Sequence, residues 1–213
     1  MAVNTEKYKS LVFELSGRAT MVAVSKTKPI EDIQALYDLG QRDFGENYVQ
    51  EMADKAVVMP KDIRWHFIGH LQRNKVKYIA SFVHLIHGVD GVELLKEINK
   101  QGAKNNRVID CLLQVHIAKE ETKFGFDENE LSQLNELHDL KNVNVIGLMG
   151  MASFTDDEDL VRSEFANLRS LFDSNKLSIL SMGMSGDYKI ALEEGSNMVR
   201  IGSLIFGERN YSK

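Results

Sequence analysis

The sequence predicts an α/β protein whose fold is a single (β/α)8 TIM barrel preceded by one extra N-terminal helix. Short apolar runs alternate with amphipathic segments about eight times along the chain, which is the pattern of parallel strands joined by right-handed crossovers. No change of composition marks a linker, so we expect residues 1–213 to form one domain. No G-x-G-x-x-G motif follows a predicted strand, which weakens the alternative of an open, doubly wound sheet. Eight units favour closure, although the periodicity alone is compatible with both forms.

In the first half of the chain, the expected helices and strands alternate after an initial polar helix at residues 6–15. The strand candidates are rich in β-prone apolar residues and lie at 21–26, 42–47, 64–69, 84–90 and 108–117. The helix candidates carry apolar residues at helical spacing and lie at 30–40, 48–59, 74–82 and 91–101. The strand at 108–117 is the most continuously apolar, which is typical of a strand buried on both faces of a parallel sheet.

The second half repeats this rhythm. We expect helices at 128–140, 157–174 and 188–195, and strands at 143–152, 177–186 and 198–207. The eighth unit shows no clear final helix after its strand.

The composition is that of an ordinary soluble globular protein, with 43% hydrophobic and 27% charged residues in a chain of 213. The formal net charge is -5 and no long basic run occurs, so nucleic acid is not an expected partner. Neither a signal peptide nor an apolar span of ~20 residues is present, so we expect a cytoplasmic protein that does not enter the membrane. The single cysteine, Cys111, lies in an apolar run and is expected to be a buried, inert thiol.

The ends of the last two predicted strands carry small polar residues. In (β/α)8 barrels the working groups lie at the C-terminal ends of the strands, and a phosphate site is frequently built after strands seven and eight. Ser185-Gly186 and Gly202-Ser203 occupy these two places, and hydroxyls with closely approaching backbone N–H groups can bind a phosphate. One such pair could merely relieve crowding at a strand end, but two pairs on neighbouring strands favour a phosphate site.

The stretch MVAVSKTKP, residues 21–29, ends the first predicted strand with two lysines. Both could be solubilising charges, or one could be the covalent anchor of an aldehyde cofactor. Strand alternation places Lys26 and Lys28 on one face, with Lys26 ~6.6 Å deeper in the barrel. Desolvation lowers the pKa of a lysine from about 10.4 toward neutrality and makes it nucleophilic. The pattern therefore favours Lys26 as the anchor, and we expect Lys28 to be a more hydrated cation at the rim.

Arg200 stands in the otherwise apolar run MVRIGSLIF, where an unpartnered guanidinium would be costly. It lies two residues before Gly202 and could point into the barrel toward a ring held by Lys26 and by the phosphate site. Taken alone, it could equally be a buried ion-pair partner of Asp187 or Glu46.

The histidines do not predict a metal site. His66 and His70 are separated by ~13 Å along an extended segment, which is too far for both to bind one ion. His84 and His87 are expected to point to opposite faces of their strand.

Several longer motifs occur along the chain in a fixed order. They are AVSKTKP, GQRDFGENYVQE, WHFIGHLQRNK, LLQVHIAKEETKFGF, GLMGMA, LSMGMSGDY and GSNMVRIGSLIFGERNY. Together they resemble the pyridoxal-phosphate homeostasis proteins, a family similar to the N-terminal domain of alanine racemase, from about Met21 to Tyr211. The resemblance implies a fold-type III barrel that binds pyridoxal 5′-phosphate (PLP).

The resemblance also implies a role for each matching residue. Lys26 would form the internal aldimine, and Arg200 would face the pyridine nitrogen. Asn47 would line the pocket. The phosphate would be held by Ser185, Gly202 and Ser203.

The family's properties imply a protein of PLP homeostasis without strong turnover. Its members are generally monomeric and are thought to buffer or deliver the cofactor, so apo PLP-dependent enzymes are candidate recipients. An arginine at the pyridine nitrogen disfavours protonation of the ring and weakens it as an electron sink. Alanine racemase takes a second base from an additional domain, whereas the printed sequence ends at Lys213, so we expect no such base. The alternative is a PLP-dependent racemase or lyase of narrow scope.

The chain departs from the usual family pattern at four positions. These are His116 in place of asparagine, Gly88 in place of serine, Ser153 in place of proline and Asn197 in place of threonine. We expect these departures to leave cofactor binding intact and to alter the polarity of the pocket.

Overall fold

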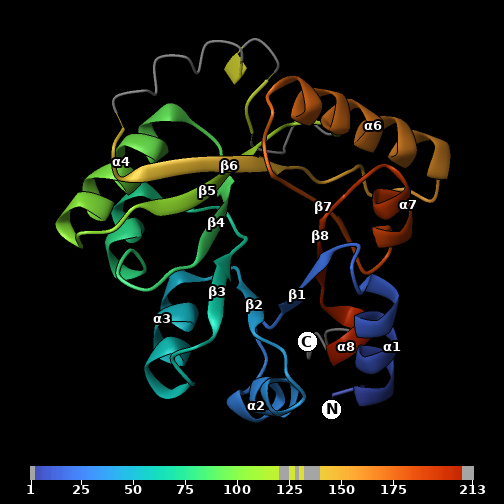
Figure 1. Ribbon diagram of the computed structural model, residues 1–213, viewed down its shortest axis with the longest axis horizontal. Coiled ribbons are helices and arrows are strands. Elements are labelled where there is room, and N and C mark those ends of the chain that lie inside the picture. The colour runs from blue at the N-terminus through green and yellow to red at the C-terminus, as the bar shows by residue number, and fades with distance from the viewer. Residues whose placement is uncertain (1–2, 120–124, 128–129, 132–139, 208–213) are drawn as a thin grey trace, which may run out of the picture.

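The eight strands form one closed, parallel barrel in a computed structural model that describes residues 3–119, 125–127, 130–131 and 140–207. The strands follow one another around the ring in chain order, and β8 pairs with β1 (Figure 1). Their bounds are β1 (Thr20–Val24), β2 (Asp43–Glu46), β3 (Arg64–Phe67), β4 (Leu85–Val89), β5 (Ile109–Gln114), β6 (Val143–Met149), β7 (Ile179–Met184) and β8 (Met198–Ile201). The predicted barrel is confirmed, and the open sheet is wrong.

The helices lie around the outside of the ring of strands (Figure 1). Their bounds are α1 (Thr5–Leu15), α2 (Ile30–Asp38), α3 (Val49–Val58), α4 (Val92–Lys104), α6 (Glu158–Ser174), α7 (Tyr188–Glu193) and α8 (Ser203–Phe206). None of the described helices combines the length and the apolar character needed to cross a bilayer. The helix expected at 128–140 falls almost entirely outside the described residues.

The helix expected at 74–82 is wrong. The structure has a six-residue 3-10 helix there, η1 (Arg73–Tyr78), followed by tight turns. Ile79, Ala80 and Val83 are fully buried, so the segment follows the sheet closely and reaches β4 by a short path. The apolar spacing that suggested an α-helix arises from these buried turns.

The strand expected at 198–207 is also too long. It ends at Ile201, and the apolar run continues as α8, in which the N–H groups of Ile205 and Phe206 donate to the carbonyl of Gly202. The backbone N–H of Asn4 donates to the Ile205 carbonyl at 2.8 Å, beside α1. Periodicity does not separate a short apolar strand from a short buried helix.

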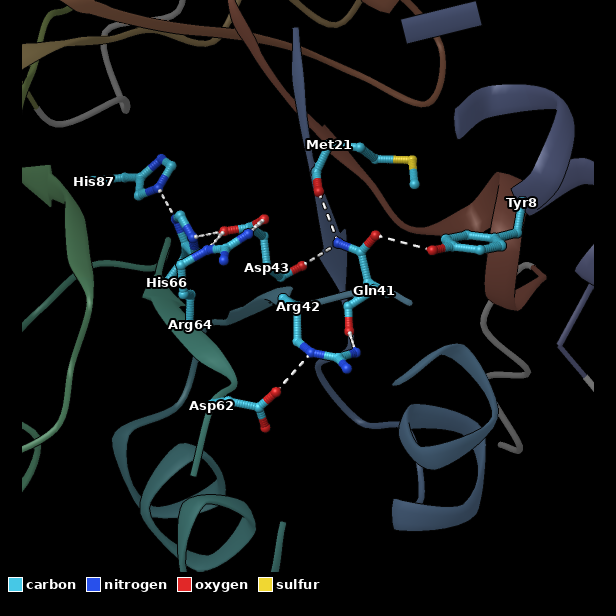
Figure 2. Close-up of polar contacts among 9 residues, drawn as sticks. All are labelled: Tyr8, Met21, Gln41, Arg42, Asp43, Asp62, Arg64, His66 and His87. Carbon is cyan, nitrogen blue, oxygen red and sulfur yellow. Dashed lines mark hydrogen bonds and ion pairs between the residues drawn. The ribbon is translucent and has the colours of Figure 1, made fainter. Parts of the chain in front are cut away.

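The extra N-terminal helix α1 is tied to the end of the barrel opposite to the C-terminal ends of the strands. The Tyr8 hydroxyl donates to Gln41 Oε1 at 3.3 Å, and Gln41 Nε2 donates to the backbone carbonyls of Met21 and Asp43 at 2.8 and 2.7 Å (Figure 2). The helix predicted there is confirmed, and its buried tyrosine connects it to β1 and β2.

The barrel core has two layers. The larger layer lies between the strands and the helices, and strand alternation assigns a smaller cluster to the barrel interior: Val22, Leu85, Leu112, Met149 and Met198. Cys111 is fully buried in the larger layer, and burial raises the pKa of its thiol. The prediction of a buried cysteine is confirmed.

Candidate functional site

A cavity of about 340 Å³ opens where the C-terminal ends of β1, β2, β7 and β8 meet. The residues that line it include all six predicted from the sequence: Lys26, Asn47, Ser185, Arg200, Gly202 and Ser203. Side chains of Val24, Ile68, Met151 and Met184 complete an apolar wall. Barrel closure therefore brings together residues that lie up to 177 positions apart, between Lys26 and Ser203 (203 − 26 = 177).

A hydrogen bond connects the residues that follow β7 and β8 at the wall of this cavity. The Gly202 N–H donates to Ser185 Oγ at 3.1 Å, so the two small polar pairs are neighbours. Because a hydroxyl can accept and donate at once, Ser185 keeps its own proton for a ligand. A Cβ at Gly186 would have nothing within 4 Å, so the backbone there borders open space.

Lys26 sits on a strongly constrained turn after β1. The Lys28 N–H donates to the Ser25 carbonyl at 3.0 Å, and Thr27 adopts a φ of 62°. This left-handed conformation is unfavourable for a β-branched residue and needs support from its surroundings. Glu51 provides that support, because its Oε1 accepts from the Thr27 N–H at 2.6 Å.

A buried ionic cluster of Lys55, Glu46 and Glu51 also stabilises this turn. Lys55 Nζ donates to Ser25 O at 2.8 Å, to Glu46 Oε1 at 2.8 Å and to Glu51 Oε1 at 2.7 Å. Ser25 Oγ also donates to Glu46 Oε1 at 2.6 Å. Burial raises the pKa of Glu46, while the charge of Lys55 acts in the opposite direction. This cluster was not predicted from the sequence, in which the i,i+4 pair Glu51 and Lys55 is its local signal.

Lys28 was predicted to be a more hydrated cation at the rim, but the structure gives it partners within the protein. Its Nζ donates to the Phe206 carbonyl at 2.9 Å and lies 5.9 Å from the centre of the Phe206 ring. It also lines the cavity, and both lysines are partly buried. The reason is α8, which the sequence did not predict and which brings Phe206 back toward β1.

Arg200 is buried, with 4% of its surface exposed. One terminal nitrogen donates to the carbonyl and the hydroxyl of Ser181 at 2.9 and 2.8 Å, and the other donates to the Gly150 carbonyl at 3.0 Å. Burial lowers the pKa of Arg200 to about 10, against the opposing effect of the Asp187 charge. Among the described residues, Arg200 has no carboxylate at ion-pair distance, so the alternative pairing with Asp187 or Glu46 is wrong.

Asn47 presents an unsatisfied acceptor. Its Oδ1 is buried, lacks a hydrogen-bond partner in the described part of the chain, and belongs to a residue that lines the cavity. Buried polar atoms are nearly always hydrogen-bonded, so an orphaned acceptor at a cavity wall is consistent with a ligand that donates to it.

A second, more open cleft of about 730 Å³ lies beside the ends of β3 and β4. It contains His70 and Asp90, which are 2.8 Å apart, together with Glu93 and Glu97. Three carboxylates in one cleft would repel an anion. The smaller cavity, with three cationic side chains and several neutral donors, is the better site for a phosphorylated ligand.

At the opposite end of the barrel, Asp43, His66 and His84 approach one another within 4.8 Å. Sequence analysis paired His66 with His70 and His84 with His87, and so it missed this cluster, whose members come from three separate segments. Figure 2 shows the His66 ring and the Arg64 guanidinium both reaching the Asp43 carboxylate, to which both donate. These internal partners satisfy the carboxylate, and we assign no ion to the cluster.

The structure explains two of the departures from the family pattern by side-chain hydrogen bonds. Ser153 donates to Glu164 through both its hydroxyl and its backbone N–H, at 2.7 and 2.6 Å, and proline would lose both bonds. Asn197 accepts from the Leu180 N–H and donates to the Ser178 carbonyl, each at 2.8 Å. A threonine side chain has no atom pair that reproduces this bridge.

Gly88 is explained by crowding. A Cβ at this position would lie 2.5 Å from the Gly69 carbonyl oxygen, so serine would not fit without a shift of β3 or β4. His116 donates its backbone N–H to the Phe126 carbonyl at 3.1 Å. None of the four departures is among the described residues that line the 340 Å³ cavity, so they do not set its polarity directly.

Comparison with known proteins shows the family of this chain. The family model of the alanine racemase N-terminal domain matches residues 1–210. A pyridoxal phosphate homeostasis protein of Aquifex aeolicus is 44% identical over 210 residues, which cover 93% of this chain and 92% of that protein. The chain belongs to this family.

Solved structures of relatives have the same architecture. PipY of Synechococcus elongatus, in a structure with PLP bound, superimposes on this family member with a TM-score of 0.87. The two are 33% identical, and the match covers 95% of this chain and 99% of PipY. An alanine racemase of Clostridium difficile matches with a TM-score of 0.80 at 12% identity, over 98% of this chain and 57% of the racemase. That likeness shows the shared barrel fold alone.

Proposed function

We propose that this chain binds PLP in the 340 Å³ cavity and takes part in PLP homeostasis as a carrier without strong catalytic turnover. The observation that carries the proposal is that one cavity contains a lysine amine, a buried guanidinium and a cluster of uncharged donors. Its close relative PipY has been solved with PLP bound. The proposal includes residues 1–213 as one PLP-binding domain that acts as a monomer in the cytoplasm.

The residues of the cavity fit the chemical groups of PLP one by one. PLP, when bound, supplies an aldehyde that reacts with amines and a pyridine ring that withdraws electrons. The Lys26 amine is the group that would hold the aldehyde carbon. Ser185, Gly202 and Ser203 offer hydroxyl and backbone donors to the phosphate. Arg200 retains guanidinium donors beyond the three it uses, and these suit an unprotonated ring nitrogen.

The same residues support weak turnover. Racemisation needs an acid–base group on each side of the reacting carbon. Among the described residues that line the cavity, the titratable side chains are Lys26, Lys28 and Arg200. Lys28 donates a hydrogen bond to the Phe206 carbonyl. Arg200 is a guanidinium with no acceptor for a proton, so it does not act as a base. A holding role, with apo PLP-dependent enzymes as recipients, therefore suits the cavity better than a racemase or a lyase of narrow scope.

Loading of the purified protein with PLP tests the binding role. After removal of free cofactor, we expect wild type and Lys28→Ala to retain a visible absorbance band and Lys26→Ala to lose it. The Lys28 variant is the matched control, because it removes an equally charged side chain from the same cavity. An unchanged band in Lys26→Ala would overturn the assignment of Lys26.

Exchange of the α-proton separates the carrier from the enzyme. The loaded protein is incubated in D₂O with a panel of L- and D-amino acids, and deuterium incorporation is followed by NMR. We expect exchange far slower than the turnover of ordinary enzymes, on the order of 1–1000 per second. Exchange in that range for any one amino acid would support the racemase or lyase alternative.

A further inference from the structure

A continuous chain of polar side chains crosses the interior of the barrel from Arg200 to Asp43. Arg200 donates to Ser181 Oγ at 2.8 Å, and Ser181 Oγ lies 3.1 Å from His87 Nδ1. His87 Nε2 lies 2.9 Å from His66 Nδ1, and His66 Nε2 lies 3.0 Å from Asp43 Oδ1. Figure 2 shows the end of this chain that runs from His87 to Asp43. Its five members come from β8, β7, β4, β3 and β2.

All five members are buried. Ser181 and His87 are completely inaccessible, and none of the five exposes more than 7% of its surface. A buried polar group without a hydrogen-bond partner is destabilising, so each member depends on its neighbours. Strand alternation places Leu85 on the same face of β4 as His87, and Met198 on the same face of β8 as Arg200.

The direction of the hydrogen bonds follows from the two ends. A guanidinium only donates and a carboxylate only accepts, so Arg200 donates to Ser181 Oγ and His66 donates from Nε2 to Asp43. A neutral imidazole has one donor and one acceptor nitrogen, so His66 Nδ1 accepts from His87 Nε2, and His87 Nδ1 accepts the proton of the Ser181 hydroxyl. Burial lowers the pKa of His66 and of His87, which agrees with two neutral rings. Every bond therefore points from the cation toward the carboxylate.

We propose that His66 and His87 are positioning residues that hold Arg200 in one orientation toward the PLP ring. The chain fixes the Ser181 hydroxyl as an acceptor for Arg200, and Asp43 at the far end fixes the tautomer of both histidines. Aligned hydrogen bonds in a low-dielectric interior polarise one another. The inference rests on the proposed function, because it assigns a purpose to the orientation of Arg200 in the cofactor cavity.

The tautomers of the two histidines are measurable in the protein without cofactor. Long-range ¹H–¹⁵N correlation spectra distinguish rings protonated at Nε2, at Nδ1 or at both. We expect His66 and His87 both to be neutral and protonated at Nε2 near neutral pH. A proton on Nδ1 of either ring would reverse the chain and overturn the proposal.

A single hydroxyl tests the link to Arg200. We expect Ser181→Ala to weaken PLP binding about tenfold and to shift the absorbance band of the bound cofactor, because Arg200 loses an acceptor. Ser196→Ala is the matched control, since Ser196 is 4% exposed and, among the described residues, its hydroxyl bonds only to the backbone carbonyls of residues 180, 182 and 198.

The outcomes separate this inference from the proposed function. If wild type takes up no PLP, the proposed function is wrong, and so is the proposed role of the hydrogen-bonded side chains from Arg200 to Asp43. If wild type binds PLP, and Ser181→Ala matches Ser196→Ala in PLP affinity and in the absorbance spectrum, only the proposed role of these hydrogen-bonded side chains is wrong. If Ser181→Ala does not fold, the tautomer measurement still tests the inference, because it uses the wild-type protein without cofactor.

Discussion

The backbone N–H of Thr27 donates to Oε1 of Glu51 at 2.6 Å, and this bond joins the turn after β1 to the first part of α3. Thr27 is held at a φ of 62°, a conformation that costs on the order of 1–3 kcal/mol for a residue of this type. The place of Lys26 in the cavity is therefore determined by residues of α3 and β2 that lie outside it.

Removal of the Glu51 carboxylate should release this turn. We expect Glu51→Ala to lower the free energy of unfolding by about 2 kcal/mol, because the Thr27 N–H and Lys55 both lose an acceptor. PLP affinity should fall as well, since Lys26 is held less firmly. Glu31→Ala is the control, because Glu31 also lies in the first turn of a helix, α2. Stability is measured by urea unfolding and PLP affinity by titration. Equal losses in the two variants would contradict the proposal that Glu51 holds the turn at Thr27.

Lys55 tests the buried ionic cluster. We expect Lys55→Met to cost about 3–5 kcal/mol, because it leaves the buried Glu46 carboxylate without its cation. The double variant Lys55→Met with Glu46→Gln should recover part of this loss, since the uncompensated charge is gone. Denaturant unfolding of the wild type, Lys55→Met, Glu46→Gln and the double variant gives the coupling free energy. Additive effects would show that the two side chains act independently.

The barrel, Lys26 and the small polar pairs at the ends of β7 and β8 were predicted from rules about parallel strands. Asn47 was expected only from the family resemblance, which also favoured the cavity over an ion pair for Arg200. Closure places the ends of β1, β2, β7 and β8 together, whatever the intervening segments are. The contacts of Lys55 and His87 could not be predicted in this way, because their partners lie on other strands and depend on register. The error at 203–207 had a local cause: the run after Gly202 has the apolar character of a strand, and only its packing beside α1 makes it a helix.

Gly88 should tolerate no side chain. A Cβ there would meet the Gly69 carbonyl at 2.5 Å, whereas a Cβ at Gly91 would have nothing within 4 Å. We expect Gly88→Ser, which restores the usual family residue, to lower the free energy of unfolding by about 1–3 kcal/mol. Gly91→Ser is the control and should change stability by less than about 0.5 kcal/mol. If chemical denaturation gives the reverse order, the close approach of β3 and β4 is not what excludes serine.

His87 should make the stability of the fold depend on pH. Burial lowers the pKa of His87 well below its ordinary 6.5, so the unfolded chain binds a proton more readily than the folded one. The stability from the neutral ring is present above the unfolded pKa and is lost as pH falls toward the folded pKa. His87→Gln removes this dependence, although its amide can still donate to His66.

We therefore expect the stability difference between wild type and His87→Gln to shrink by about 1 kcal/mol between pH 7.5 and 5.5. Urea unfolding at a series of pH values measures this difference, and the contribution of Glu46 is common to both proteins and cancels. A difference that stays constant, or grows on acidification, would mean that His87 is already charged in the folded state.

The most direct test of the central claim is to locate the residue that holds PLP. The loaded protein is treated with borohydride, which reduces the bond between an amine and the cofactor, and is then digested and analysed by mass spectrometry. We expect the phosphopyridoxyl mass on Lys26, with Lys28 unmodified, because Lys28 is bonded to the Phe206 carbonyl. Modification mainly at Lys28, or none in the peptide that contains both lysines, would contradict the account.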